Sequence, residues 1–164
     1  METTKQIIIS KVKLVKGSIQ IDYEKYRDNY WDTLRLTSEE KAAPEFYDAF
    51  LNLDSHISNI MSFTGEVMVH RISPNEVVLA YGSFGKSSVK FGFNLYLPLS
   101  GEYVSVVTPA LNEPPSTMKN PTGAEHTDFL ANQTWEAVQH LLDETEKYIN
   151  GSRAQMNLFE PDTK

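Results

Sequence analysis

The fold class is decided by the stretch Ile8-Ile9-Ser10-Lys11-Val12-Lys13-Leu14-Val15-Lys16-Gly17-Ser18-Ile19-Gln20-Ile21-Asp22-Tyr23. Polar and apolar side chains alternate on both sides of Gly17-Ser18, a period of two that is typical of strands with one wet face. Glycine and serine favour a turn between the two runs. A third run, with Leu34 and Leu36 facing inward, follows a polar loop. The segment therefore predicts a three-stranded antiparallel meander.

The apolar spacing changes after Pro44. Proline fits the first turn of a helix, because the N–H that it lacks would have no partner there. From Pro44 to residue 62 apolar residues recur at steps of three and four, which predicts one helix over 44–62 with a single apolar stripe. The stripe consists of Phe46, Ala49, Phe50, Leu53, Ile57, Ile60 and Met61.

Four further strands are predicted, over residues 66–73, 76–84, 88–99 and 102–108. Turn-forming residues separate them, namely Ser73-Pro74-Asn75, Gly85-Lys86 and Ser100-Gly101. Prolines at positions 109, 114, 115 and 121 interrupt backbone pairing and predict a surface loop over residues 109–125.

A second helix is expected from about residue 127 to Asn150, because Gly151 is a good helix stop. Its predicted sheet-facing residues are Leu130, Val138, Leu141, Leu142, Tyr148 and Ile149. Strands grouped around two helices, without strict alternation, predict the α+β class. We expect a mainly antiparallel sheet of about seven strands with two helices on one face, in one domain over residues 1–151. Residues 152–164 would form an exposed, flexible tail.

Composition restricts the possible functions. The 164 residues are 40% hydrophobic and 23% charged, which fits one globular domain. A formal charge of -7 argues against wrapping duplex DNA through a broad basic face. The absence of cysteine excludes disulfides, cysteine-bound zinc, thiol nucleophiles and iron–sulfur clusters. Neither a signal peptide core nor a bilayer-spanning run is found, so we expect a cytoplasmic protein without membrane contact.

No motif predicts a reaction, a metal or a cofactor. The stretch from Gly82 to Ser87 departs from a phosphate-binding loop, since Ala80 replaces the first glycine and a strand follows instead of a helix. Histidines 56, 70, 126 and 140 lack the short spacing of metal ligands and are expected to be surface or packing residues. No hydrolase motif or convincing carboxylate pair is present. The sequence therefore favours a non-enzymatic protein over an enzyme.

Strand alternation assigns the aromatic run after Lys90 mainly to the core. Phe91, Phe93, Leu95 and Leu97 would share the inner face, while Lys90, Asn94 and Tyr96 would lie on the other face. This separates the run from an RNA-recognition strand, in which cation and aromatics share one platform. A small stacking and charge site for single-stranded nucleic acid remains open, formed by Lys86, Lys90 and Tyr96.

The tail carries the most specific signal. Gln155-Met156-Asn157-Leu158-Phe159 resembles the bacterial sliding-clamp-binding motif: a glutamine, an aliphatic residue, a small polar or acidic residue, then leucine and phenylalanine. Met156 stands where leucine is more usual, and Asn157 where aspartate or serine is commoner. The resemblance implies that the bacterial DNA polymerase sliding clamp is the partner.

The chemistry of this peptide fits such a role. The Gln155 amide can donate and accept hydrogen bonds at once, and Leu158 and Phe159 can fill a preformed apolar pocket. Burying both would contribute roughly 3 to 5 kcal/mol before ordering costs, which suits micromolar binding. The alternative is that Leu158 and Phe159 fold back onto their own domain.

The rest of the chain is similar to a group of small bacteriophage-encoded proteins of unassigned function. The features shared are a lysine-rich first strand, a helix start at Pro44-Glu45-Phe46-Tyr47, and a closing helix followed by Gly-Ser-Arg-Ala-Gln at residues 151–155. The resemblance spans most of the chain. It implies a replication or recombination setting in a bacterial host.

Three hypotheses follow from the sequence. In the first, the chain is a non-enzymatic accessory protein or modulator that binds the clamp through residues 155–159, while the body blocks other clamp partners or brings a further replication or recombination protein. In the second, one face of the sheet binds single-stranded nucleic acid. In the third, an enzyme site lies beneath the proline-rich loop, which has the composition of a lid.

Overall fold

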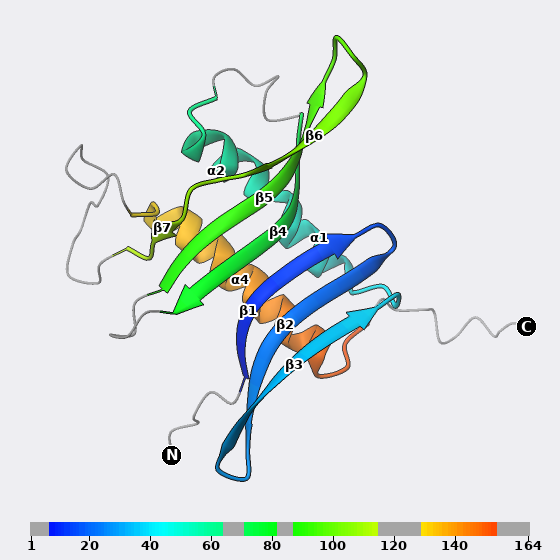
Figure 1. Ribbon diagram of the computed structural model, residues 1–164, viewed down its shortest axis with the longest axis vertical. Helices are drawn as coiled ribbons and strands as arrows, with labels where there is room; N and C mark the ends of the chain where they lie inside the picture. The colour runs from blue at the N-terminus through cyan, green and yellow to red at the C-terminus, as the bar shows by residue number, and fades with distance from the viewer. Residues whose placement is uncertain (1–6, 64–70, 82–86, 115–128, 154–164) are drawn as a thin grey trace, which may run out of the picture.

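A computed structural model describes residues 7–63, 71–81, 87–114 and 129–153 (Figure 1). These residues form one seven-stranded antiparallel sheet with helices on one face only. The predicted α+β class, with its antiparallel sheet and helical layer, is confirmed. The parts of the predicted strands at residues 66–70 and 82–84, and the expected start of the second helix, lie outside the described residues.

The first meander consists of β1 (Ile7–Val15), β2 (Ser18–Arg27) and β3 (Tyr30–Ser38). The β1–β2 turn contains Gly17 with φ +78°, a conformation that suits glycine. Asp28 and Asn29, with φ 53° and 72°, form the two-residue turn before β3, as in the primed turns favoured by hairpins. The predicted meander is confirmed, with β2 and β3 longer than the apolar alternation suggested.

The second meander consists of β4 (Ile72–Tyr81), β5 (Ser87–Leu97) and β6 (Glu102–Val107). The sheet order is β3-β2-β1-β4-β5-β6, and the two-residue β7 (Leu111–Asn112) pairs with β5 inside the stretch predicted as a loop. Within the described residues, the two meanders pair only through β1 and β4, where three residues of each strand are paired, from Lys11 with Val78 to Lys13 with Glu76.

The predicted turn at Ser73-Pro74-Asn75 is wrong, because β4 runs straight through it. Pro74 lies opposite Phe93, and the register shifts between Pro74 and Glu76. A bulge inserts an extra residue into the strand and locally disrupts the ladder, so the missing N–H of proline is tolerated there. The polar Asn75 falls at the bulge instead of in a loop, and β4 spans the described parts of both expected strands.

The single helix expected over residues 44–62 is divided into α1 (Pro44–Leu51) and α2 (Leu53–Ile60). Asn52 separates them, yet it keeps right-handed backbone angles and its N–H still donates to the Asp48 carbonyl at 2.9 Å. Asparagine is a weak helix former, since its side chain competes for backbone hydrogen bonds. The apolar stripe therefore stays in phase across the break and remains directed at the sheet.

The last helix, α4 (Asn132–Ile149), crosses behind both meanders (Figure 1). It begins five residues later than expected, with Leu130 buried just ahead of it. Val12 and Val77, paired at the junction of the meanders, are fully buried, so the core is continuous across the sheet. The core residues of the helical layer are Phe46, Ala49, Phe50, Leu53, Ile57, Leu130, Val138, Leu141, Leu142 and Tyr148.

Candidate functional site

The clamp-binding-like residues Gln155, Met156, Asn157, Leu158 and Phe159 lie outside the described residues, but the end of the body that precedes them is described. Gly151, with φ +112°, ends α4. The Ser152 N–H donates to the Lys147 carbonyl at 2.9 Å, and the Gly151 N–H to the Tyr148 carbonyl at 3.1 Å. These two bonds form a Schellman motif, which fixes the direction in which the chain leaves the helix.

Arg153 fixes the chain to the body once more. Its Nε donates to Glu40 Oε1 at 2.7 Å, and its Nη1 donates to the Tyr148 carbonyl. Its guanidinium carbon lies 3.8 Å from the centre of the Tyr148 ring. The Tyr148 hydroxyl in turn donates to the Glu40 carbonyl. We call Glu40, Tyr148 and Arg153 the C-terminal anchor; through it Arg153, which was expected in the tail, contacts the body.

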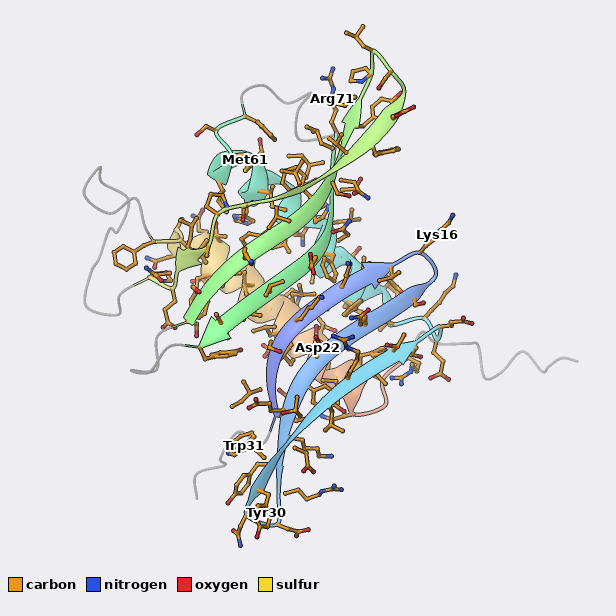
Figure 2. The ribbon with its side chains drawn as sticks, in the orientation of Figure 1. Lys16, Asp22, Tyr30, Trp31, Met61 and Arg71 are labelled. Carbon is orange, nitrogen blue, oxygen red and sulfur yellow. The ribbon has the colours of Figure 1, made fainter. Side chains whose placement is uncertain are left out.

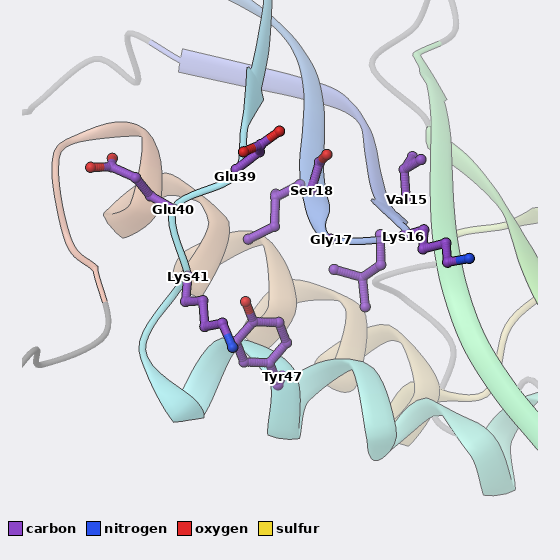
Figure 3. Close-up of a pocket in the computed structure, with 10 residues that line it drawn as sticks. Val15, Lys16, Gly17, Ser18, Glu39, Glu40, Lys41 and Tyr47 are labelled. Atoms are coloured by element: carbon purple, nitrogen blue, oxygen red, sulfur yellow. The ribbon is translucent and has the colours of Figure 1, made fainter.

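The anchor adjoins a cavity of about 530 Å³ that Glu40 also lines (Figure 3). Leu14 and Ile19, on either side of the β1–β2 turn, form its apolar wall, and Tyr47 of α1 closes the opposite side. The charged rim carries both signs, from Lys16, Glu39, Glu40 and Lys41. We call it the hairpin cavity. It is an open concavity of mixed character that no residue predicted from the sequence had indicated.

The open face of the sheet holds two of the three residues predicted for nucleic-acid contact. Lys90 and Tyr96 lie on the same side of β5, as the alternation predicts, while Lys86 lies outside the described residues. Six residues of strand separate them by roughly 20 Å, so they do not form one compact site. Tyr96 instead pairs with Tyr103 of β6, with ring centres 5.2 Å apart. Tyr103 was missed because only the register of the two strands reveals it.

A second aromatic pair lies at the opposite end of this face, where Tyr26 and Trp31 have ring centres 5.1 Å apart. Figure 2 shows Trp31 at the far end of the β2–β3 hairpin and Asp22 nearer the middle of the sheet. Arg35 donates to both carboxylate oxygens of Asp22, at 2.7 and 3.0 Å. These hydrogen bonds hold the pKa of the Asp22 carboxyl below its ordinary value.

Two cations of the open face, Arg35 and Lys11, are each matched by a carboxylate. Lys11 lies 3.5 Å from Glu76 on this face, whereas the Arg27–Asp32 pair, 2.9 Å apart, lies on the other side of the β2–β3 hairpin by strand alternation. Among the described residues, Lys13 and Lys90 make no ion pair. The face combines two aromatic pairs with a nearly balanced charge, which makes it a weak attractor for a polyanion.

The histidines that the structure describes behave as packing or surface residues. His56 Nδ1 lies 2.8 Å from Thr134 Oγ1 and links α2 to the start of α4. Burial lowers the pKa of His56, since it disfavours the charged ring. His140 is exposed, and His70 and His126 lie outside the described ranges. Within those ranges no three acidic or histidine side chains gather as metal ligands would.

No protein-family model, curated protein or solved structure matches this chain. Among the helices that the structure describes, none has the length and apolar character needed to span a bilayer.

Proposed function

We propose that this chain is a non-enzymatic accessory protein of bacterial or phage DNA replication or recombination, which docks on the sliding clamp through Gln155–Phe159. One observation carries the proposal: the described body ends in the C-terminal anchor, and only Ala154 separates Arg153 from Gln155. The peptide therefore starts from a fixed point on the protein surface. Its side-chain chemistry suits a preformed apolar pocket with a polar entrance.

The anchor also suits a role for the folded body in clamp binding. When a peptide and a second contact belong to one chain, the second binding event becomes intramolecular and gains effective concentration. With the peptide starting beside α4, a clamp bound there would be held close to the sheet. The body could then block other clamp partners or present a further replication or recombination protein. A cytoplasmic location follows from this role.

The test is a titration of purified bacterial sliding clamp against the full chain, followed by calorimetry. The variant Gln155→Ala, Leu158→Ala, Phe159→Ala removes the polar contact and both apolar anchors. We expect it to bind at least 100-fold more weakly, because burying the two apolar side chains contributes roughly 3 to 5 kcal/mol. The matched control Asp162→Ala, Thr163→Ala changes the same tail outside the motif and should bind like the wild type.

Equal binding by the wild type and the triple variant would contradict the proposal, as would no binding by either. Loss of binding in the Asp162→Ala, Thr163→Ala control to the same extent would also contradict it, since the motif would then not be the recognised segment.

A second candidate is binding of single-stranded nucleic acid on the open face. It is favoured by the Tyr96–Tyr103 pair, whose rings offer a stacking surface on the same face as Lys90. The test is a mobility shift of a labelled oligodeoxythymidine with the full chain over a range of salt concentrations. This candidate predicts affinity that falls steeply with salt, and that falls further in Lys90→Ala, Tyr96→Ala but not in the triple tail variant. Binding that is insensitive to salt and to Lys90 and Tyr96 would exclude it.

A further inference from the structure

β1 and β4 separate just beyond their short ladder of three residue pairs. Pairing ends at Lys11 with Val78, and the register of β1 against β2 shifts between Ile9 and Lys11. Beyond that point the backbone of β4 no longer reaches β1. The Tyr81 hydroxyl donates to the Ile9 carbonyl at 2.6 Å instead, so a side chain bridges the two strands where a backbone bond would otherwise lie. Figure 1 shows α4 passing behind this part of the sheet.

A cavity of about 280 Å³ occupies the space between the two strands and α4. Its walls are mainly hydrocarbon, from Ile7 and Ile9 of β1, Leu79 of β4, and Leu142 of α4. The ring of Trp135, which lies one helical turn before Gln139 in α4, adds a flat aromatic surface. We call this the interstrand cavity. Its volume lies just below the usual range for small-molecule sites, so it suits one or two rings rather than a dinucleotide or a long acyl chain.

A buried polar group in the wall points to a ligand. Ser87 lies opposite Tyr81 in the β4–β5 ladder and is only 7% exposed. Its N–H donates to Glu113 Oε1 at 2.8 Å, and its carbonyl accepts from the Glu113 N–H at 2.9 Å. Its hydroxyl has no partner in the described part of the chain. A buried hydroxyl without a hydrogen bond is costly, and a bound polar atom would relieve this.

The remaining polar groups define the ligand further. The Gln139 side chain, from α4, offers one acceptor and two donors and likewise has no partner among the described residues. The Tyr81 oxygen retains lone pairs after donating to Ile9, and burial raises the pKa of Tyr81, which keeps it protonated. Among the described residues that line the cavity, Glu146 is the one charged residue, so this part of the lining has a negative charge and no cation to receive a phosphate.

We propose that the interstrand cavity binds a neutral heteroaromatic molecule of one or two rings, with its flat face on Trp135 and a donor–acceptor edge on Ser87 and Gln139. The apolar walls bury the body of the ring, and the two unpartnered side chains select a ligand that can both donate and accept. Free nucleobases belong to this chemical class, whereas nucleotides are disfavoured by Glu146. This site is independent of the tail peptide and of the open face.

The test uses the full chain carrying Trp31→Phe, so that Trp135 is the single tryptophan and reports on the cavity directly. Adenine and uracil serve as the two-ring and one-ring probes, and adenosine monophosphate as the charged probe. We expect saturable quenching of Trp135 fluorescence by at least one nucleobase, with binding of adenosine monophosphate at least tenfold weaker than that of adenine.

Ser87→Ala should weaken binding about tenfold, because it removes one hydrogen bond from a buried edge. The matched control Ser88→Ala changes the next residue of the same strand, which lies on the open face, and should leave the affinity unchanged. Gln139→Leu provides a second, independent variant, with a similar expected loss.

Absence of saturable quenching by both nucleobases would overturn the assignment. So would adenosine monophosphate binding as tightly as adenine, since a neutral ligand would then not be preferred. Unchanged affinity in both Ser87→Ala and Gln139→Leu would show that the ring is not held by the edge proposed.

Discussion

The two faces of β5 differ in what holds their side chains in place. On the covered face, Phe91 and Phe93 are 0% and 1% exposed and pack beneath the helices. On the open face, Lys90 is exposed, and Tyr96 contacts one partner, Tyr103. One face is thus fixed by burial of many apolar groups and the other by individual pairs. The difference shows which face can accept substitutions without loss of the fold.

The largest expected effect separates the two faces by neighbouring residues. Phe91→Ala should lower the free energy of unfolding by about 3–5 kcal/mol, since it removes a fully buried ring and leaves a cavity. Lys90→Ala, one residue away on the open face, should change it by no more than about 0.5 kcal/mol. Denaturant unfolding of both variants measures the contrast, and similar losses in the two would show that the faces are not distinguished by burial.

A smaller effect is expected where the open face is crowded. A Cβ at Gly92 would lie 2.8 Å from Glu76 Oε1 and 3.0 Å from Glu76 Cβ, so Glu76, which pairs with Lys11, would have to shift. Gly92→Ala should therefore cost about 1–2 kcal/mol of unfolding free energy. Combining it with Glu76→Ala should reduce this cost, and a double-mutant cycle measures the coupling. Strict additivity would mean that Glu76 is not the obstacle.

The smallest effect concerns charge on the open face. The pKa of Asp22 is lowered in the folded protein, chiefly by its hydrogen bonds from Arg35, so the unfolded chain binds the proton more readily. The stabilisation is complete above the unfolded pKa of about 4 and is lost as the pH falls through the lower, folded pKa. Asp22→Asn should thus be less stable than the wild type at neutral pH and converge with it in acid. Parallel stability curves over that range would argue against the pairing.

The sequence predicts those parts of the fold that depend on period and turn chemistry. Alternation placed Phe91 and Phe93 inside and Lys90 and Tyr96 outside, and Gly17 and Gly151 marked a turn and a helix end as expected. Pro74 was misinterpreted because a bulge permits proline inside a strand, and only the partner strand reveals the bulge. Local residue preferences do not contain that information.

Contacts between distant parts of the chain were harder to predict. The C-terminal anchor joins Arg153 to Glu40, which is 113 residues away, and no local pattern indicates such a pair. The interstrand cavity exists because β1 and β4 pair over three residues only, which is a matter of sheet order and register. For the tail peptide the opposite holds. Its five residues indicate a partner from the sequence alone, and they lie outside the described structure.

The proposed function requires that the clamp binds the tail peptide and leaves the fold of the body unchanged. The most direct measurement is a backbone amide NMR titration of the isotope-labelled full chain with unlabelled sliding clamp. We predict that the signals of Gln155–Phe159 lose intensity first and most, while signals of core β5 residues such as Phe91 decline only uniformly with the size of the complex. Unchanged tail signals, or selective changes confined to the sheet, would contradict the proposed function.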